Sequence, residues 1–253
     1  MALLEQAFLF SISLVANILS AMAGGGAGLL QLPALLFLGL PFSVALATHK
    51  IATVALGVGA SLQHARAGHV HWPFALMILA AGLPGVVLGA RIILDIPDVL
   101  AEWALGILTI SLGIYSVFKP QLGHQFTPQH RTWPGLILGA LVLFLLGILN
   151  GSLASGTGLF VTLWLIAWFG FDFKRATAYT LLLVGLFWNG AGALTLAFLS
   201  PVKWAWLPAL LAGSLLGGFL GARIAVNRGN VFIKRVFEIA TLLVGASLIV
   251  KNL

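Results

Sequence analysis

The chain repeats itself at an offset of 132 residues, and this duplication constrains the fold more than any other feature of the sequence. Residues 88–92 recur letter for letter at 220–224. Without a gap, the same offset pairs further small, polar and aromatic residues: Ser20 with Ser152, Gly24 with Gly156, Gly26 with Gly158, Thr48 with Thr180, Trp72 with Trp204 and Gly113 with Gly245. The repeat predicts two related halves that enclose a shared site.

The composition predicts that most of the surface faces lipid. Of the 253 residues, 60% are hydrophobic and 8% are charged, whereas about a quarter of a soluble domain is charged. The net charge of +7 does not indicate a nucleic-acid partner, because the basic residues are scattered between apolar runs. The absence of cysteine excludes disulfides and thiolate metal sites. The three histidines nearest one another, His64, His69 and His71, have no carboxylate near them, so we predict no metal site and no cofactor.

Apolar runs bounded by glycine, proline or charge predict an all-α polytopic membrane protein with five helical segments in each half. The segments cover about 6–22, 28–39, 43–64, 72–93, 99–118, 135–153, 158–170, 173–198, 204–226 and 232–250. We therefore expect a first transmembrane repeat at 1–118, a linker at 119–134 and a second repeat at 135–253. The second segment of each half is short, so eight full spans with half-helices describe the pattern equally well.

The loop charges predict that the two repeats are inverted. If each short segment counts as a crossing, each half crosses an odd number of times and nine basic residues share one side: Arg66, Lys119, Arg131, Lys174, Arg175, Arg223, Arg228, Lys234 and Arg235. If each broken pair makes one pass, these charges divide almost evenly. The positive-inside rule favours the first arrangement. It predicts an inner-membrane protein with a cytoplasmic linker and both termini in the periplasm. We expect no cleavable signal peptide, because the first segment lacks a basic start and carries Glu5.

Two interruptions of the helical pattern are the strongest candidates for a binding site. One is Gly24-Gly25-Gly26, and the other is Ser155-Gly156-Thr157. A helix that begins inside the membrane directs unpaired N–H groups and about half a positive charge toward the gap, which favours an anion. Inverted repeats bring two such ends together near the midplane. The alternative is that both interruptions are tight turns that only pack helices.

Lys50 adds a charge to the membrane interior, where an ammonium costs at least about 2.5 kcal/mol. It either lies near the edge of the membrane or faces an anion. We place Lys50 in the predicted substrate site together with its neighbours Thr48 and His49. Four polar groups lie within apolar runs, and we predict that they face the same cavity: Gln31, Thr180, Tyr179 and Asn189.

These residues resemble those of the TauE/SafE family of sulfite exporters and anion permeases. The resemblance rests on the glycine-rich break with a proline-containing short run after it, on residues 45–50 (Ala-Leu-Ala-Thr-His-Lys) and on the Gly-Ala-Arg at the end of the fourth segment. It covers essentially the whole chain, although family members usually have asparagine where this chain has His49. The resemblance implies export or permeation of small sulfur-containing anions such as sulfite, sulfoacetate or related organosulfonates.

We therefore predict a transporter, not an enzyme, whose partners are a small anionic substrate and the lipid bilayer. The sequence leaves the oligomeric state open, a homodimer included. One alternative is a channel for a small neutral or cationic solute, although such channels use carbonyl or carboxylate linings. Another is an intramembrane serine protease with its nucleophile near Ser152 or Ser155, for which only His49 lies deep enough to act as the base.

Overall fold

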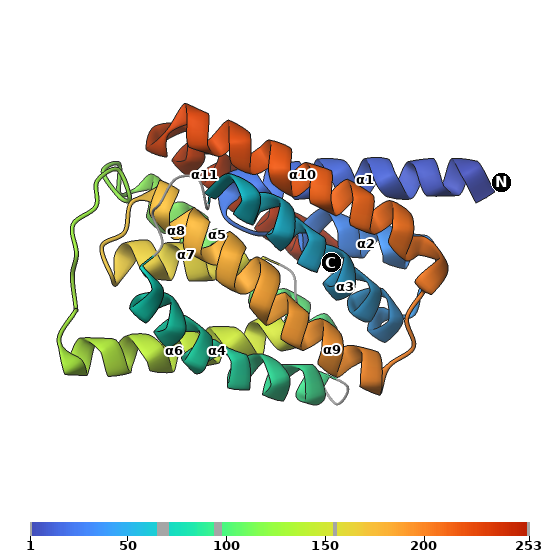
Figure 1. Cartoon of the computed structure of the whole chain (residues 1–253), viewed down its shortest axis with the longest axis horizontal. Helices are drawn as coiled ribbons and strands as arrows, with labels where there is room; N and C mark the ends of the chain where they lie inside the picture. Colours follow the sequence, from blue (N-terminus) through green and yellow to red (C-terminus); the bar gives the residue numbers. More distant parts are fainter. Residues whose placement is uncertain (1, 65–70, 94–97, 154–155, 252–253) are drawn as a thin grey trace.

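The computed structural model describes residues 2–64, 71–93, 98–153 and 156–251, and the regular elements in this part of the chain are all helices (Figure 1). The first half contains α1 (Ala2–Ala23), α2 (Gly28–Phe37), α3 (Phe42–His64), α4 (Trp72–Ile92) and α5 (Asp98–Val117). The second contains α6 (Trp133–Leu153), α7 (Thr157–Ala167), α8 (Phe173–Tyr179), the π-helix η3 (Thr180–Trp188), α9 (Asn189–Leu199), the 3-10 turn η4 (Trp204–Trp206), α10 (Leu207–Arg228) and α11 (Asn230–Lys251).

The prediction of an all-α polytopic membrane protein is confirmed. Six helical stretches of the described residues are long and apolar enough to cross a membrane: Leu3–Ala23, Phe42–Gln63, Trp72–Ile92, Trp133–Leu153, Phe173–Leu199 and Trp204–Arg228. The two short segments expected after the breaks are the short helices α2 and α7, of 10 and 11 residues. An α-helix of that length covers about 15 Å, half the thickness of the hydrocarbon core.

The two halves interlock through equivalent pairs of helices. In Figure 1, α1 lies along α10, and α6 lies along α4. The offset of 132 residues relates α1 to α6 and α4 to α10, so both pairs join one half to the other. Glycines permit the close approach, because a Cβ on Gly217 would lie 2.6 Å from Leu14 O, and one on Gly85 would lie 2.2 Å from Phe144 O.

The first half begins and ends at opposite ends of the molecule (Figure 1). The N-terminus lies at one end, and the linker between α5 and α6 lies at the other, as an odd number of passes requires. The linker is tied to the α7–α8 connection, since Thr127 N donates to Gly170 O (2.9 Å) and the ring of His130 stacks on Trp168 at 3.8 Å. The inverted repeats, the boundaries of the halves and the membrane side of each end stay predictions.

Candidate functional site

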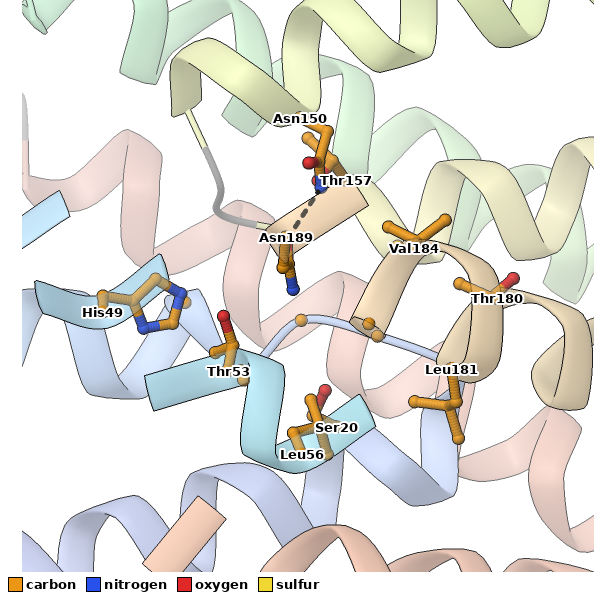
Figure 2. Close-up of a pocket in the computed structure, with 16 residues that line it drawn as sticks. Ser20, His49, Thr53, Leu56, Asn150, Thr157, Thr180, Leu181, Val184 and Asn189 are labelled. Atoms are coloured by element: carbon orange, nitrogen blue, oxygen red, sulfur yellow. Dashed lines mark hydrogen bonds between the residues drawn. The ribbon is translucent and has the colours of Figure 1, made fainter. Parts of the chain in front are cut away.

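A small cavity lies where the two helix breaks meet the crossing of α3 and η3 (Figure 2). Its wall consists of Ser20, Gly25, Gly26, Ala27, Gly28, His49, Thr53, Leu56, Asn150, Thr157, Gly158, Thr180, Leu181, Val184, Gly185 and Asn189. The cavity volume is about 30 Å³, which is room for about two waters. In this conformation, therefore, the site has very little free space.

The first break consists of three glycines in backbone conformations that other residues rarely adopt. The φ angles of Gly24, Gly25 and Gly26 are +86°, +142° and +101°. A Cβ on Gly25 would lie 2.6 Å from the Cα of Gly158. The two breaks thus touch backbone to backbone, and glycine is required at this contact both for its conformation and for its size.

Two helix N-termini border the cavity. Gly26, Ala27 and Gly28 form its wall where α2 begins, and Thr157 and Gly158 do so where α7 begins. The first N–H groups of a helix have no partner within the helix, and they carry its partial positive charge. Ser155, a predicted member of the second break, lies outside the described residues.

Lys50 is fully buried and does not belong to the cavity wall. Its Nζ donates three hydrogen bonds, to Asn150 O (2.6 Å), Asn150 Oδ1 (2.8 Å) and Asn189 Oδ1 (3.1 Å). The carbonyl of Asn150 lies in the last turn of α6, where carbonyls lack helical partners and the helix dipole is negative. The lysine is therefore held inside the protein by amide oxygens and does not extend its ammonium to the surface.

The two asparagines separate Lys50 from the cavity that they both border. Asn189 accepts from the ammonium through Oδ1, so its amide nitrogen points the other way, into the cavity (Figure 2). The amide nitrogen of Asn150 donates to Thr157 Oγ1 (2.8 Å), at the start of α7. A cation on the oxygen of an amide strengthens its N–H groups as donors. Lys50 thus acts on the cavity through neutral groups.

Two further polar groups in the wall have no hydrogen-bond partner among the described residues. They are the Nδ1 atom of His49 and the hydroxyl of Ser20, and both residues are buried. Buried polar groups are nearly always paired, so two unpaired groups facing one cavity are available to a ligand or to water.

No carboxylate belongs to the cavity wall in the part of the chain that the structure describes. Across the described residues there are two ion pairs, Arg175–Asp172 and Lys234–Glu238, and neither includes Lys50. No acidic side chain with a described position therefore compensates the positive charge of Lys50 and of the two helix N-termini at the site.

Some of the predicted site residues lie together in the cavity wall, and the others lie outside it. The predicted residues in the cavity wall are Gly25, Gly26, His49, Thr157 and Thr180, and those outside it are Gly24, Gln31, Thr48, Lys50 and Gly156. Gly24 O accepts from the hydroxyl of Thr162 (2.8 Å). The hydroxyl of Thr48 donates to Val44 O (2.7 Å) and accepts from Lys203 N (3.0 Å).

Three polar residues of the wall are absent from the predicted site: Ser20, Thr53 and Asn150. Asn189, which was expected to face the cavity, lies in its wall, whereas Tyr179 does not. The hydroxyl of Ser152, the residue considered as a protease nucleophile, donates to Ile148 O (2.9 Å), and Ser152 lies outside the wall.

A bundle of membrane-length helices with a buried polar site at a pair of broken helices is the architecture of a membrane transporter. Comparison with known proteins agrees. The family described as Sulfite exporter TauE/SafE matches residues 9–248, so the chain belongs to the TauE/SafE family of membrane transporters.

Its relatives carry general names. A probable membrane transporter protein of Haemophilus influenzae is 30% identical over 96% of this chain and 94% of its own length. The probable membrane transporter protein YfcA of Escherichia coli K12 is 28% identical over 95% of this chain and 88% of its own length. No solved structure matches the chain.

Proposed function

We propose that the cavity binds a small sulfur-containing oxyanion, such as sulfite or an organosulfonate, and that the protein exports it across the inner membrane. The observation that carries the proposal is the meeting of two helix N-termini on a cavity whose described wall residues include no carboxylate, with a buried lysine behind it. Helix N-termini bind anions through directed N–H groups, and a cation favours the same charge.

The residues of the wall suit an oxyanion. N–H groups at Gly26 and Gly158, with the amide of Asn189 and the hydroxyl of Ser20, offer hydrogen-bond donors from several directions. The hydroxyl oxygens of Thr162 and Thr180 lie 2.9 Å apart, so this pair holds the turn near the first break. The Nδ1 atom of His49, which has no partner among the described residues, gives the wall one further polar group.

The small volume of the cavity supports a carrier that opens and closes rather than a permanently open pore. Sulfite has four heavy atoms and needs more space than two waters, so the breaks must separate slightly when it binds. The contact of Gly25 with Gly158 is the point where such a movement would open the site. Movement of one inverted repeat against the other would then expose the site to each side in turn.

Export needs no coupling ion under this proposal. A membrane potential that is negative inside drives an anion outward by about 2.3 kcal/mol per charge per 100 mV. The proposed orientation, with the linker in the cytoplasm and the termini in the periplasm, follows the basic residues and is tested by reporter fusions at both ends.

Charge movement in proteoliposomes tests the function directly. The purified chain should produce a current when sulfite or a sulfonate is added on one side, with the sign of a moving anion. Chloride and a neutral solute of similar size are the matched controls. A current carried by cations, or uptake of the neutral solute without a current, would contradict the proposal and support a channel.

A further inference from the structure

A basic pocket opens at the linker end of the molecule and shares no residue with the central cavity. Its volume is about 390 Å³, and the described residues of its wall include two arginines, Arg131 and Arg175, but no carboxylate. The hydroxyl of Tyr179 also belongs to the wall and accepts from His71 N (2.6 Å). The pocket is therefore built for a negatively charged group.

Arg131 is the cation of this pocket without a counter-ion. Its guanidinium lies 4.3 Å from the ring centre of Phe74 and 5.2 Å from that of Phe171, and Nη2 donates to Phe169 O (3.3 Å). Arg175 pairs with Asp172, and no such pair includes Arg131 among the described residues. Burial lowers the pKa of Arg131 from its ordinary value. Most of its five N–H donors are free to bind an acceptor.

An apolar groove meets the basic pocket at Arg131. The groove has a volume of about 500 Å³ and runs between the N-terminal parts of α4 and α6. Past Arg131 its wall is apolar and includes Met77, Ile137 and Ala140. A ligand that fills both spaces must therefore have an anionic head and a hydrocarbon tail.

Two exposed tryptophans indicate the depth of the site in the membrane. Trp72 begins α4 and is 57% exposed, and Trp133 begins α6 and is 79% exposed. Exposed tryptophans at helix ends are typical of the membrane–water interface. Arg131 precedes Trp133 by two residues and so lies at the level of the headgroups. Ala140 lies about 10 Å further along α6, toward the hydrocarbon.

We propose that this pocket and groove bind one anionic phospholipid. The phosphate lies between Arg131 and Arg175, where guanidinium groups bind phosphate oxygens in pairs, and an acyl chain occupies the groove between α4 and α6. A zwitterionic lipid brings a second cation into a pocket that already holds two arginines, so it binds less well. The bound lipid would join the linker to one helix of each half.

Native mass spectrometry of the purified chain in a neutral detergent tests this site. With equal amounts of dioleoyl phosphatidylglycerol and dioleoyl phosphatidylcholine, the wild type should retain the first lipid preferentially. Arg131→Gln should reduce that retention by about five-fold, the effect of one lost cation near a headgroup. Arg91→Gln is the matched control, because Arg91 is an exposed arginine in the last turn of the same α4.

A second variant tests the groove without removing a charge. Ala140→Trp fills the groove and keeps both arginines, so it should also lose phosphatidylglycerol, even if Arg131→Gln fails to fold. Glycerol phosphate, which has the headgroup chemistry without a tail, should not compete at concentrations equal to the lipid. Equal retention of both lipids, full retention by Ala140→Trp, or effective competition by glycerol phosphate would each overturn the proposal.

Discussion

The polar groups beside the two helix breaks differ in kind, although α1 and α2 at the first break correspond to α6 and α7 at the second. Behind the first break, α1, α2 and α10 share a neutral network of Ser13, Asn17, Gln31 and Ser214. Beside the second, α3, α6, α7 and α9 share a network that holds a cation: Lys50, Asn150, Thr157 and Asn189. The second network reaches the cavity wall, whereas no member of the first does.

The duplicated positions show that each network exists only once. At the offset of 132 residues, Asn17 and Gln31 correspond to Leu149 and Leu163, and Lys50 corresponds to Leu182. The breaks and the packing glycines are retained in both halves, but the polar side chains are not. The repeat therefore provides the helix breaks and the glycine contacts between helices, and we call these glycine contacts the packing frame. The polar network of the proposed site occurs beside one break only.

The largest expected effect comes from removing the charge that distinguishes the second network. Lys50→Met keeps the length of the side chain but leaves three amide oxygens without their donor. A cation behind the cavity favours an anion in it, so the loss of the charge should reduce anion transport in proteoliposomes to background. The variant should still be recovered from the membrane as a single species on gel filtration. Transport at the wild-type rate would show that the lysine only supports the fold.

Glycine substitutions should distinguish the role of the glycines at the breaks in ligand binding from the role of the packing-frame glycines in stability. Gly25→Ala places a methyl group 2.6 Å from the Cα of Gly158, at a φ of +142°. The strain is on the order of 1–3 kcal/mol, and we expect at least about a ten-fold loss of sulfite affinity.

Gly85→Ala is the matched control on the packing frame, since its Cβ would lie 2.2 Å from Phe144 O in α6. It should lower the midpoint of thermal unfolding while ligand still protects the protein. The comparison is measured as the shift in that midpoint with added sulfite. If added sulfite shifts the unfolding midpoint of Gly25→Ala as much as that of the wild type, the breaks are turns that do not bind the substrate.

The sequence was sufficient to predict the segments, because glycine, proline and charge delimit apolar runs wherever a helix must end in a membrane. It was less informative about side-chain direction. Thr48, His49 and Lys50 are consecutive on one helix, so they point about 100° apart, and among these three only His49 belongs to the cavity wall. Thr48 instead bonds to Lys203 N, and Lys50 bonds to α6.

Asn150 could not be predicted because its role depends on a contact 100 residues away in the chain. Near the end of a helix, an asparagine is typical of a local cap. Ser20 was missed for a similar reason, since a serine in an apolar helix usually bonds to its own backbone, whereas this hydroxyl has no partner among the described residues.

Two substitutions of Asn189 test whether the second network acts on the anion through the positive charge of Lys50 or through the N–H donor of Asn189. Asn189→Leu removes the donor that points into the cavity and should raise the KM for sulfite about ten-fold, the cost of one hydrogen bond. Asn189→Asp places a carboxylate beside Lys50 and so neutralises it, and its KM should rise further. The measurement is the concentration dependence of the sulfite current. A wild-type KM for Asn189→Asp would contradict a role for the positive charge.

The smallest effect on transport should come from the first network, where Asn17→Leu copies the leucine found at position 149. Asn17 Nδ2 donates to Ser214 Oγ (3.0 Å) and Gln31 Oε1 (3.3 Å). Without Asn17, Ser214 still bonds to Ser13, but the buried Gln31 Oε1 has no donor among the described residues. The free energy of unfolding should fall by about 1–3 kcal/mol, while the sulfite KM stays unchanged. Adding Gln31→Leu removes the stranded amide, and it should recover part of the lost stability because both partners are then apolar. If the single variant instead raised the KM as much as Asn189→Leu does, the two networks would be coupled. The first network would then contribute to substrate binding and not to stability alone.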